Sequence, residues 1–374
     1  MCSSTAWPRW PLVVFLLAGC VRQGGEDRAG EARSGGAEHA PTEQRRPEVA
    51  KKREEEVARS SSNDAPGRAK RDVPRVTNEG FPASGCRPIA VDGERVVVGT
   101  NRRTIRLFEG PRRWSLVAET ATEPCGLFLI GDSVYWTELG DLDAEFRNGR
   151  VMSAELSTKK AEEVAGSQYN PTDLVAGQSG VFWFECGTGR LWRMAEDRRV
   201  EVIAQVPSDA SGYAHGCPGR GLAAENGVLA WVHRTGPFEN LRLFYAREDG
   251  TEFGEVEFDY NRLGGRDLAL VGGDAYLSLS RSIGADDAEP NVVVRVDLES
   301  GATKVVWRGL AIFVGSRGSS VLWAEYGGRL FTARGGRSRL VGRLEQRLKP
   351  TRYLFSDGSL IWSNGTEVVR SRVR

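Results

Sequence analysis

The chain has 374 residues, 40% of them hydrophobic, which is enough apolar side chain for one large or two ordinary domains. Its 51 lysine and arginine residues are almost balanced by 50 aspartate and glutamate residues, so the formal net charge is +1. This balance provides no overall field that would attract nucleic acid or favour an anionic membrane surface. We therefore expect a mainly globular protein with no nucleic-acid partner.

The first twenty residues, MCSSTAWPRWPLVVFLLAGC, contain an apolar run from Pro11 to Gly19 that ends at Cys20. The run is too short to cross a bilayer and is typical of a secretory signal. Its last residues, Leu-Ala-Gly-Cys, match the lipobox, so the segment resembles the signal peptides of bacterial lipoproteins. The resemblance implies a signal peptide over residues 1–19 and a mature chain that begins at a lipidated Cys20.

The same resemblance implies an exported protein that is held on a membrane by its N-terminal lipid. Each acyl chain contributes about 0.8 kcal/mol per buried methylene, so several chains such as palmitate anchor a protein firmly. Val21 follows the cysteine, whereas an aspartate there retains enterobacterial lipoproteins in the inner membrane. Val21 therefore favours the outer membrane, at its periplasmic face or at the cell surface.

Residues 20–75 predict a disordered tether. From Val21 to about Arg75 the sequence contains no aromatic residue and is rich in charged and small residues, as in VAKKREEEVARSSSND. Such a segment cannot bury enough apolar area to offset its conformational entropy. We expect residues 76–374 to form the folded domain.

A unit built around a strand such as DSVYWTE recurs along this domain. Similar segments are QSGVFWFE, NGVLAWVH, SSVLWAE and DGSLIWSN, with two degenerate copies, GERVVVGT and GGDAYLSL. The aligned central residues are Val98, Trp136, Trp183, Trp231, Leu277, Trp323 and Trp362. Their spacings of 38 to 48 residues are within or close to the repeat lengths of propeller blades, which are roughly 40 to 50 residues.

Each repeat predicts four antiparallel strands, because strand patterns and turn residues recur at the same offsets and no convincing helical period occurs. The constant spacing favours an all-β, seven-bladed β-propeller over a pair of sandwiches. The last repeat ends after three strands. We expect residues 73–82 to supply its outer strand and to close the ring.

The VYWTE segment resembles the motif of YWTD-type propellers, and the domain as a whole is similar to NHL-type propellers and propeller lipoproteins of Gram-negative bacteria. The resemblance covers about residues 85–374 and concerns architecture, since propellers serve as binding platforms, scaffolds and enzymes alike. The aspartate of YWTD is replaced by Glu138, Glu185, His233 and Glu325 in the four matching repeats. The ligands of that family are therefore not transferred to this chain.

Four cysteines remain after Cys20: Cys86, Cys125, Cys186 and Cys217. An even number in an exported protein is typical of disulfides, and three pairings are open. In a propeller all four lie on one face. There Cys86 with Cys125 would join blades 1 and 2, and Cys186 with Cys217 would join blades 3 and 4.

A zinc site is the alternative use of this region. Glu185, His215 and His233 map near the junction of blades 3 and 4 with two of the cysteines, and histidine and cysteine are zinc ligands. Their spacing matches no compact zinc motif, and an oxidising compartment favours the disulfides.

The candidate binding face is the one that carries the long loops after the second strands of blades 2, 4 and 5, because loops on a rigid scaffold commonly carry binding residues. Its candidate residues are Glu138, Asp141, Asp143, Glu145, His233, Asp286, Asp287 and Glu289. The acidic groups in the loops of blades 2 and 5 have oxygens that suit calcium, but they lack the EF-hand pattern. A solvated acidic loop is the simpler interpretation.

The folded region contains no nucleophile elbow, phosphate-binding glycine loop or zinc-protease motif. The sequence thus predicts a non-catalytic, lipid-anchored module without a cofactor that binds an envelope protein or glycan. The alternative hypothesis is a metal-dependent hydrolase or lyase of the NHL-like propeller type.

Overall fold

The structure is a computed structural model of the whole chain, and two compact units can be separated in it, Met1–Ala69 and Lys70–Arg374. The description below concerns residues 89–92, 95–100, 102–109, 113–141, 144–206, 221–234, 241–258, 263–281, 291–309, 311–317, 319–325, 328–334, 337–343, 352–356, 359–363 and 368–372. None of the helical turns in these ranges is long and apolar enough to span a membrane.

The strands form seven sheets in chain order. Sheet 1 contains β1 (Ile89–Asp92), β2 (Arg95–Gly99), β3 (Thr104–Phe108) and β4 (Trp114–Glu119), and sheet 2 contains β5 (Pro124–Ile130), β6 (Ser133–Glu138), β7 (Gly149–Glu155) and β8 (Ala161–Gln168). Sheet 3 contains β9 (Pro171–Ala176), β10 (Val181–Glu185), β11 (Arg190–Met194) and β12 (Val200–Gln205), and sheet 4 contains β13 (Leu222–Glu225), β14 (Val228–Arg234), β15 (Leu241–Arg247) and β16 (Gly254–Glu257). Sheet 5 contains β17 (Leu263–Val271), β18 (Asp274–Arg281), β19 (Val292–Asp297) and β20 (Thr303–Arg308), and sheet 6 contains β21 (Ala311–Arg317), β22 (Ser320–Glu325), β23 (Arg329–Arg334) and β24 (Arg337–Arg343). Sheet 7 contains β25 (Arg352–Ser356), β26 (Ser359–Ser363) and β27 (Val368–Arg372).

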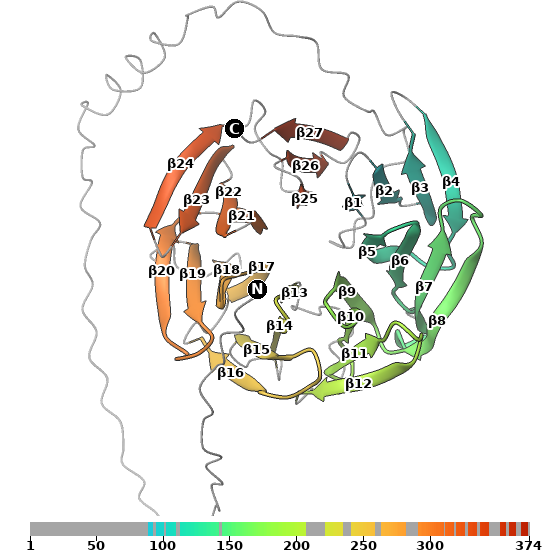
Figure 1. Cartoon of the computed structure of the whole chain (residues 1–374), viewed down its shortest axis with the longest axis horizontal. Helices are drawn as coiled ribbons and strands as arrows, with labels where there is room; N and C mark the ends of the chain where they lie inside the picture. Colours follow the sequence, from blue (N-terminus) through green and yellow to red (C-terminus); the bar gives the residue numbers. More distant parts are fainter. Residues whose placement is uncertain are drawn as a thin grey trace, which may run out of the picture. The chain divides into compact units, whose positions relative to one another are not determined.

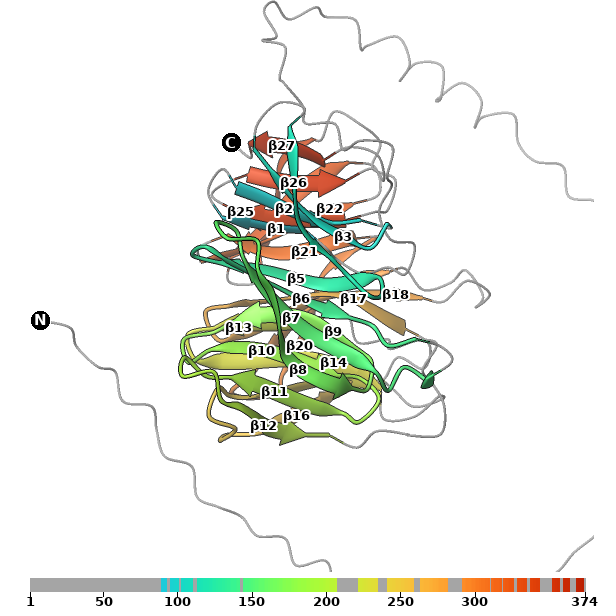
Figure 2. The same cartoon turned by 90° about the vertical axis from the view of Figure 1, so that its right-hand side faces the viewer.

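Each sheet is an antiparallel meander whose strands pair in chain order. The first strand of every sheet contacts the first strand of the next, and β25 contacts β1, so the inner strands close a ring (Figure 1). Figure 2 looks onto the outer wall of this ring, where β7 and β8 lie in front of β5 and β6. The predicted all-β propeller architecture is confirmed.

The hydrophobic core lies between neighbouring sheets. Trp136 of sheet 2 packs in one cluster with Val97 and Ile105 of sheet 1, and Trp183 of sheet 3 packs with Val151 of sheet 2. The aligned residues of the first six repeats are all almost completely buried: Val98, Trp136, Trp183, Trp231, Leu277 and Trp323. The tryptophan repeat in the sequence is therefore a repeat of inter-sheet packing, as its spacing predicted.

Gly126 shows how closely the inner strands approach one another. A Cβ atom at this position in β5 would lie 2.9 Å from the backbone nitrogen of Leu174 and 3.0 Å from the carbonyl oxygen of Thr172, both in β9. Real Cβ atoms rarely come so close to backbone, so the contact between sheets 2 and 3 requires glycine here.

Seven sheets in the described residues fit the seven predicted blades, and sheet 7 has three strands there, as its short repeat indicated. The segment 73–82, which was expected to add a fourth strand to sheet 7, lies outside the described residues. Closure by this segment stays a prediction.

Candidate functional site

The meander brings two kinds of segment to the same side of the ring, namely the segments that follow each second strand and the connections between sheets. We call this side the loop face. Among its described segments are residues 120–123, 139–141, 144–148, 169–170 and 186–189. The antiparallel alternation of strands places these segments together although they come from different repeats.

The residue two positions after each aligned core residue lies where the second strand reaches the loop face. The six described residues at this position are Thr100, Glu138, Glu185, His233, Leu279 and Glu325, and all are buried. Five of the six are polar. A buried carboxylate is strongly unfavourable unless it is paired or hydrogen-bonded, so the three glutamates must each have partners.

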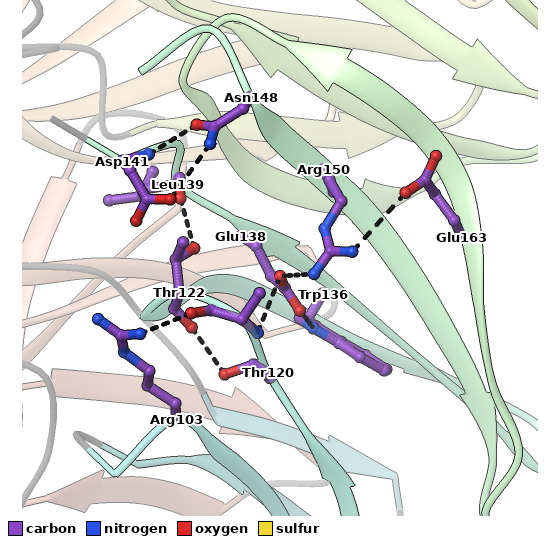
Figure 3. A network of polar contacts seen from close by, with 11 residues as sticks. Arg103, Thr120, Thr122, Trp136, Glu138, Leu139, Asp141, Asn148, Arg150 and Glu163 are labelled. Carbon is purple, nitrogen blue, oxygen red and sulfur yellow. Dashed lines mark hydrogen bonds and ion pairs between the residues drawn. The ribbon is translucent and has the colours of Figure 1, made fainter. Parts of the chain in front are cut away.

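Glu138 is 1% exposed, and its carboxylate connects three parts of sheet 2 (Figure 3). Oε1 accepts a hydrogen bond from Nε1 of Trp136 at 3.0 Å, and Oε2 accepts one from Nη2 of Arg150 at 2.6 Å. Oε2 also accepts from the backbone N–H of Ala121 at 3.3 Å. The carboxylate thereby ties the second and third strands of sheet 2 to the connection from sheet 1.

The loop after Glu138 is ordered by its own polar contacts. The hydroxyl of Thr122 donates to the carbonyl oxygen of Leu139. The backbone N–H of Asp141 donates to Oδ1 of Asn148 at 2.7 Å, and Nδ2 of Asn148 donates to Oδ2 of Asp141 at 3.1 Å (Figure 3). These bonds hold the two ends of the loop together, so its charged tip is presented on a fixed base.

Glu185 has the corresponding role in sheet 3 and is 3% exposed. Its Oε1 accepts from the backbone N–H of Tyr169 at 2.7 Å. Its Oε2 accepts from Oγ1 of Thr188 at 2.6 Å and from Nε1 of Trp192 at 2.9 Å. Three donors therefore surround a carboxylate that the sequence had suggested as a metal ligand.

The connection Tyr169–Asn170 joins the loop of sheet 2 to sheet 3. The backbone N–H of Asn170 donates to the carbonyl oxygen of Phe146 at 2.9 Å, and the guanidinium of Arg147 lies 5.2 Å from the centre of the Tyr169 ring. On the other side, a Cβ on Gly187 would lie 2.2 Å from the same ring, so the ring packs directly on backbone. The two loops form one continuous surface.

Glu325 repeats the pattern in sheet 6 with a different partner. Its carboxylate binds the guanidinium of Arg329 through both oxygens, with 2.9 Å between Oε2 and Nη2. Arg329 also lies over the ring of Phe331, 5.6 Å from its centre.

His233 stands at this position in sheet 4 and differs from the glutamates. The side chain is 4% exposed and packs edge-on against Phe184 at a ring distance of 5.1 Å, and neither ring nitrogen has a hydrogen-bond partner among the described residues. Burial lowers the pKa of His233 to about 4, because the surroundings disfavour the charged imidazolium. His233 is therefore neutral over the physiological range.

The predicted binding residues are distributed unevenly. Asp141 is exposed at the base of the loop and Glu145 is exposed at its tip, where Glu145 pairs with Arg147 at 3.3 Å, whereas Glu138 is buried. Four others, Asp143, Asp286, Asp287 and Glu289, lie outside the described residues, as does His215 of the suggested metal site. Within the described ranges, no three histidine, cysteine or acidic side chains are grouped so that they could hold a metal ion. The calcium and zinc sites stay predictions.

Cys125 is the second residue of β5, and Cys186 directly follows β10. Both are buried, and the sulfur of each belongs to a disulfide. Because Cys86 and Cys217 lie outside the described residues, the pairing of the four cysteines stays a prediction.

Sequence reasoning did not find Tyr169, Thr188 or Trp192 as parts of this site. The signal that pointed towards them is the recurring Trp-x-Glu, which places a carboxylate two residues beyond a buried tryptophan in sheets 2, 3 and 6. A buried glutamate at one repeated position indicates that donors from neighbouring segments must converge on it. Which residues supply these donors depends on the turns between sheets.

No protein-family model matches the chain. No curated protein matches its sequence. Among solved structures, the designed protein Ika8 superposes with a TM-score of 0.53 at 11% identity, over 76% of this chain and 82% of Ika8. An oligogalacturonate lyase in complex with manganese superposes with a TM-score of 0.51 at 14% identity, over 81% of this chain and 91% of the lyase. BamB from Moraxella catarrhalis has a TM-score of 0.47 at 11% identity, over 76% of this chain and 81% of BamB. At such low identity the likeness concerns the fold alone, which is a β-propeller.

Replacing Glu185 by glutamine tests the structural role of the buried carboxylate. The amide keeps the shape of the side chain but turns an NH₂ group towards one of the three donors, so a buried donor loses its acceptor. We expect Glu185→Gln to lower the free energy of unfolding by about 2 to 3 kcal/mol in urea titrations. Glu201→Gln is the matched control, because Glu201 is half exposed, pairs with Arg193 and should change stability by less than about 1 kcal/mol. Equal effects of the two variants would contradict the assignment.

Because His233 is buried in its neutral form, we expect the free energy of unfolding to depend on pH. Its folded pKa of about 4 lies below its ordinary value of 6.5, so the unfolded chain binds the proton more readily between these two values. The contribution of neutral His233 is complete above the ordinary pKa and is lost as the pH falls towards the folded pKa. We expect His233 to account for a loss of about 2 kcal/mol in unfolding free energy between about pH 8 and about pH 5. The measurement is the difference between the wild type and His233→Phe, and parallel pH profiles of the two proteins would show that His233 is not responsible.

Proposed function

We propose that this chain is a non-catalytic binding or scaffold module that is lipid-anchored at the bacterial cell envelope and holds a protein or glycan partner on its loop face. The propeller architecture supplies the rigid support. The lipobox and the tether predicted from the sequence supply the attachment to a membrane, at the outer membrane by the argument from Val21.

The observation that carries the proposal is the support of the long loop of sheet 2 from below. Glu138, which precedes the loop, binds Arg150, which follows it, and Asn148 binds Asp141 across the base of the loop. The connection at Tyr169–Asn170 packs against the far side of the loop. Preorganised loops lose little conformational entropy on binding, which favours affinity. The charged side chains of the loop, Asp141 at its base and Glu145 and Arg147 at its tip, are exposed to solvent.

The hydrogen bonds that Glu138 and Glu185 accept within the protein support a structural role for both residues. Each carboxylate already accepts three hydrogen bonds, so neither offers a free oxygen to a substrate or a metal without losing donors. The polar ring beneath the loop face accordingly serves to hold the loops, and the partner meets the loops themselves.

A second candidate function, a metal-dependent hydrolase or lyase, is favoured by one observation. The two ring nitrogens of His233 are buried and have no hydrogen-bond partner in the described part of the chain, and the low pKa of His233 keeps the imidazole in the neutral form that binds metal ions. The remaining ligands of such a site would have to come from residues outside the described ranges, such as His215 and Cys217.

Metal analysis with a free-thiol count on the unit Lys70–Arg374 separates these two functions. The binding module predicts a metal-free protein with no reduced cysteine among the four. Bound zinc together with two reduced cysteines, with the zinc absent from the His233→Phe variant, would instead establish the metal site. That result would overturn the non-catalytic proposal.

Substitutions of the exposed charged side chains of the loop test the choice of face. We expect Asp141→Asn, Glu145→Ala and Arg147→Ala combined to reduce affinity capture of envelope proteins or glycans by the Lys70–Arg374 unit. These are the exposed charges of the loop, and the amide oxygen of the asparagine can still accept the bond from Asn148 that closes its base. The measurement is the amount of each partner retained, relative to the unaltered unit.

The matched control combines Glu196→Ala, Asp197→Ala and Arg199→Ala, which remove the same charges from the exposed turn between β11 and β12 on the opposite face. This control should capture as well as the unaltered unit. Equal capture by both triple variants would reject the loop face, and no specific capture by the unaltered unit would reject the binding module.

A further inference from the structure

The near-neutral net charge conceals a separation of charge around the ring. Residues 303–374 contain 14 lysine and arginine residues against four aspartate and glutamate residues, a net charge of +10. Residues 89–302 contain 22 basic against 34 acidic residues, a net charge of −12. The first segment includes β20 and all strands of sheets 6 and 7, so the positive formal charge is concentrated in the C-terminal part of the propeller sequence.

The described part of this basic side contains a cluster on the outer wall. Arg334 at the end of β23 lies directly opposite Arg337 at the start of β24, and Arg339 lies two residues further along the same face of the strand. The neighbouring outer strand β20 contacts β24 (Figure 1), and Lys304 lies near the start of β20, as Arg337 does in β24. All four side chains are exposed, and none forms an ion pair with a carboxylate of the described residues.

Arginines on the outer strands of other sheets have acidic partners opposite them. Arg193 of β11 pairs with Glu201 of β12. Arg242 of β15 pairs with Glu257 of β16 at 3.2 Å. Like charges directly opposite one another destabilise a strand pair, so the Arg334–Arg337 pair is unfavourable until an anion lies between or over the two groups.

The apolar component of the cluster indicates which anion fits. Leu340 follows Arg339 in β24 and is 57% exposed, and the four residues from Arg337 to Leu340 are all exposed. This strand therefore presents both faces and its edge outward. Guanidinium groups bind phosphate through two parallel hydrogen bonds, and an exposed leucine among them fits the boundary between headgroups and acyl chains.

We propose that this basic edge, formed by Lys304, Arg334, Arg337, Arg339 and Leu340, docks on a membrane surface that contains anionic phospholipid. The arginines bind the lipid phosphates, and Leu340 enters the interface. A flat bilayer contacts only this edge of the ring, whereas a long soluble polyanion would also meet the acidic sheets. The basic edge would add to the membrane affinity that an N-terminal lipid provides, since stable anchoring commonly takes two such contributions. It lies on a different surface from the loop face.

Vesicle binding by the Lys70–Arg374 unit, which has no lipid, tests the proposal independently of the anchor and of any loop-face partner. We expect flotation with vesicles of phosphatidylglycerol and phosphatidylcholine in equal parts, and no flotation with phosphatidylcholine alone. Each basic residue near an anionic surface contributes about fivefold in affinity, so Arg337→Glu with Arg339→Glu should weaken binding at least about twentyfold. Increasing salt should weaken it further.

The matched control is Arg113→Glu with Arg199→Glu, which changes net charge equally at two highly exposed arginines of sheets 1 and 3. Binding by this control should stay within about twofold of the wild type, because the patch is intact. Arg337→Gln with Arg339→Gln, checked for an unchanged unfolding transition, should show an intermediate loss. Equal weakening by the control, binding to neutral vesicles, or binding to soluble polygalacturonate without binding to vesicles would overturn the proposal.

Discussion

The packing of one large side chain from each second strand against the neighbouring sheet is the interaction on which the ring depends. Trp136 and Trp183 are completely buried in clusters that combine residues of two sheets. A single meander cannot bury both of its faces, so each sheet obtains its stability from its neighbours. Closing the ring through the contact of β25 with β1 supplies the last pair of neighbours.

This packing also determines what happens at the loop face. The chain that leaves each buried tryptophan must emerge within two residues, and the residue at that point lies between its own sheet and the incoming connection. In sheets 2 and 3 a glutamate there binds the backbone N–H of that connection, at Ala121 and Tyr169. At the same position in sheet 4, His233 has no hydrogen-bond partner among the residues that the structure describes. Rigidity of the core is thus transmitted to the surface through buried polar groups.

The outer wall follows a different rule, because its strands are only half covered. Charged side chains there pair across adjacent strands in most sheets, as Arg242 does with Glu257. In sheet 6 the register instead brings Arg334 opposite Arg337. A chain with almost no net charge therefore has two electrostatically distinct surfaces, the mixed loop face and the basic edge of β24. The proposed partner and the proposed membrane contact occupy separate parts of the ring.

The sequence alone determined the propeller architecture and the position of each blade, because a tryptophan repeat of constant spacing can be buried in few other ways. It also indicated which loops share a face, since strand direction alternates in a meander. It did not show that Glu138 and Glu185 lie beneath that face, or that Tyr169 and Trp192 reach them. Those contacts join residues from different strands and turns, and only the tertiary structure decides which donors surround a buried carboxylate. The cluster of arginines was likewise undetermined, because strand register, which places Arg334 beside Arg337, depends on how the sheets pack.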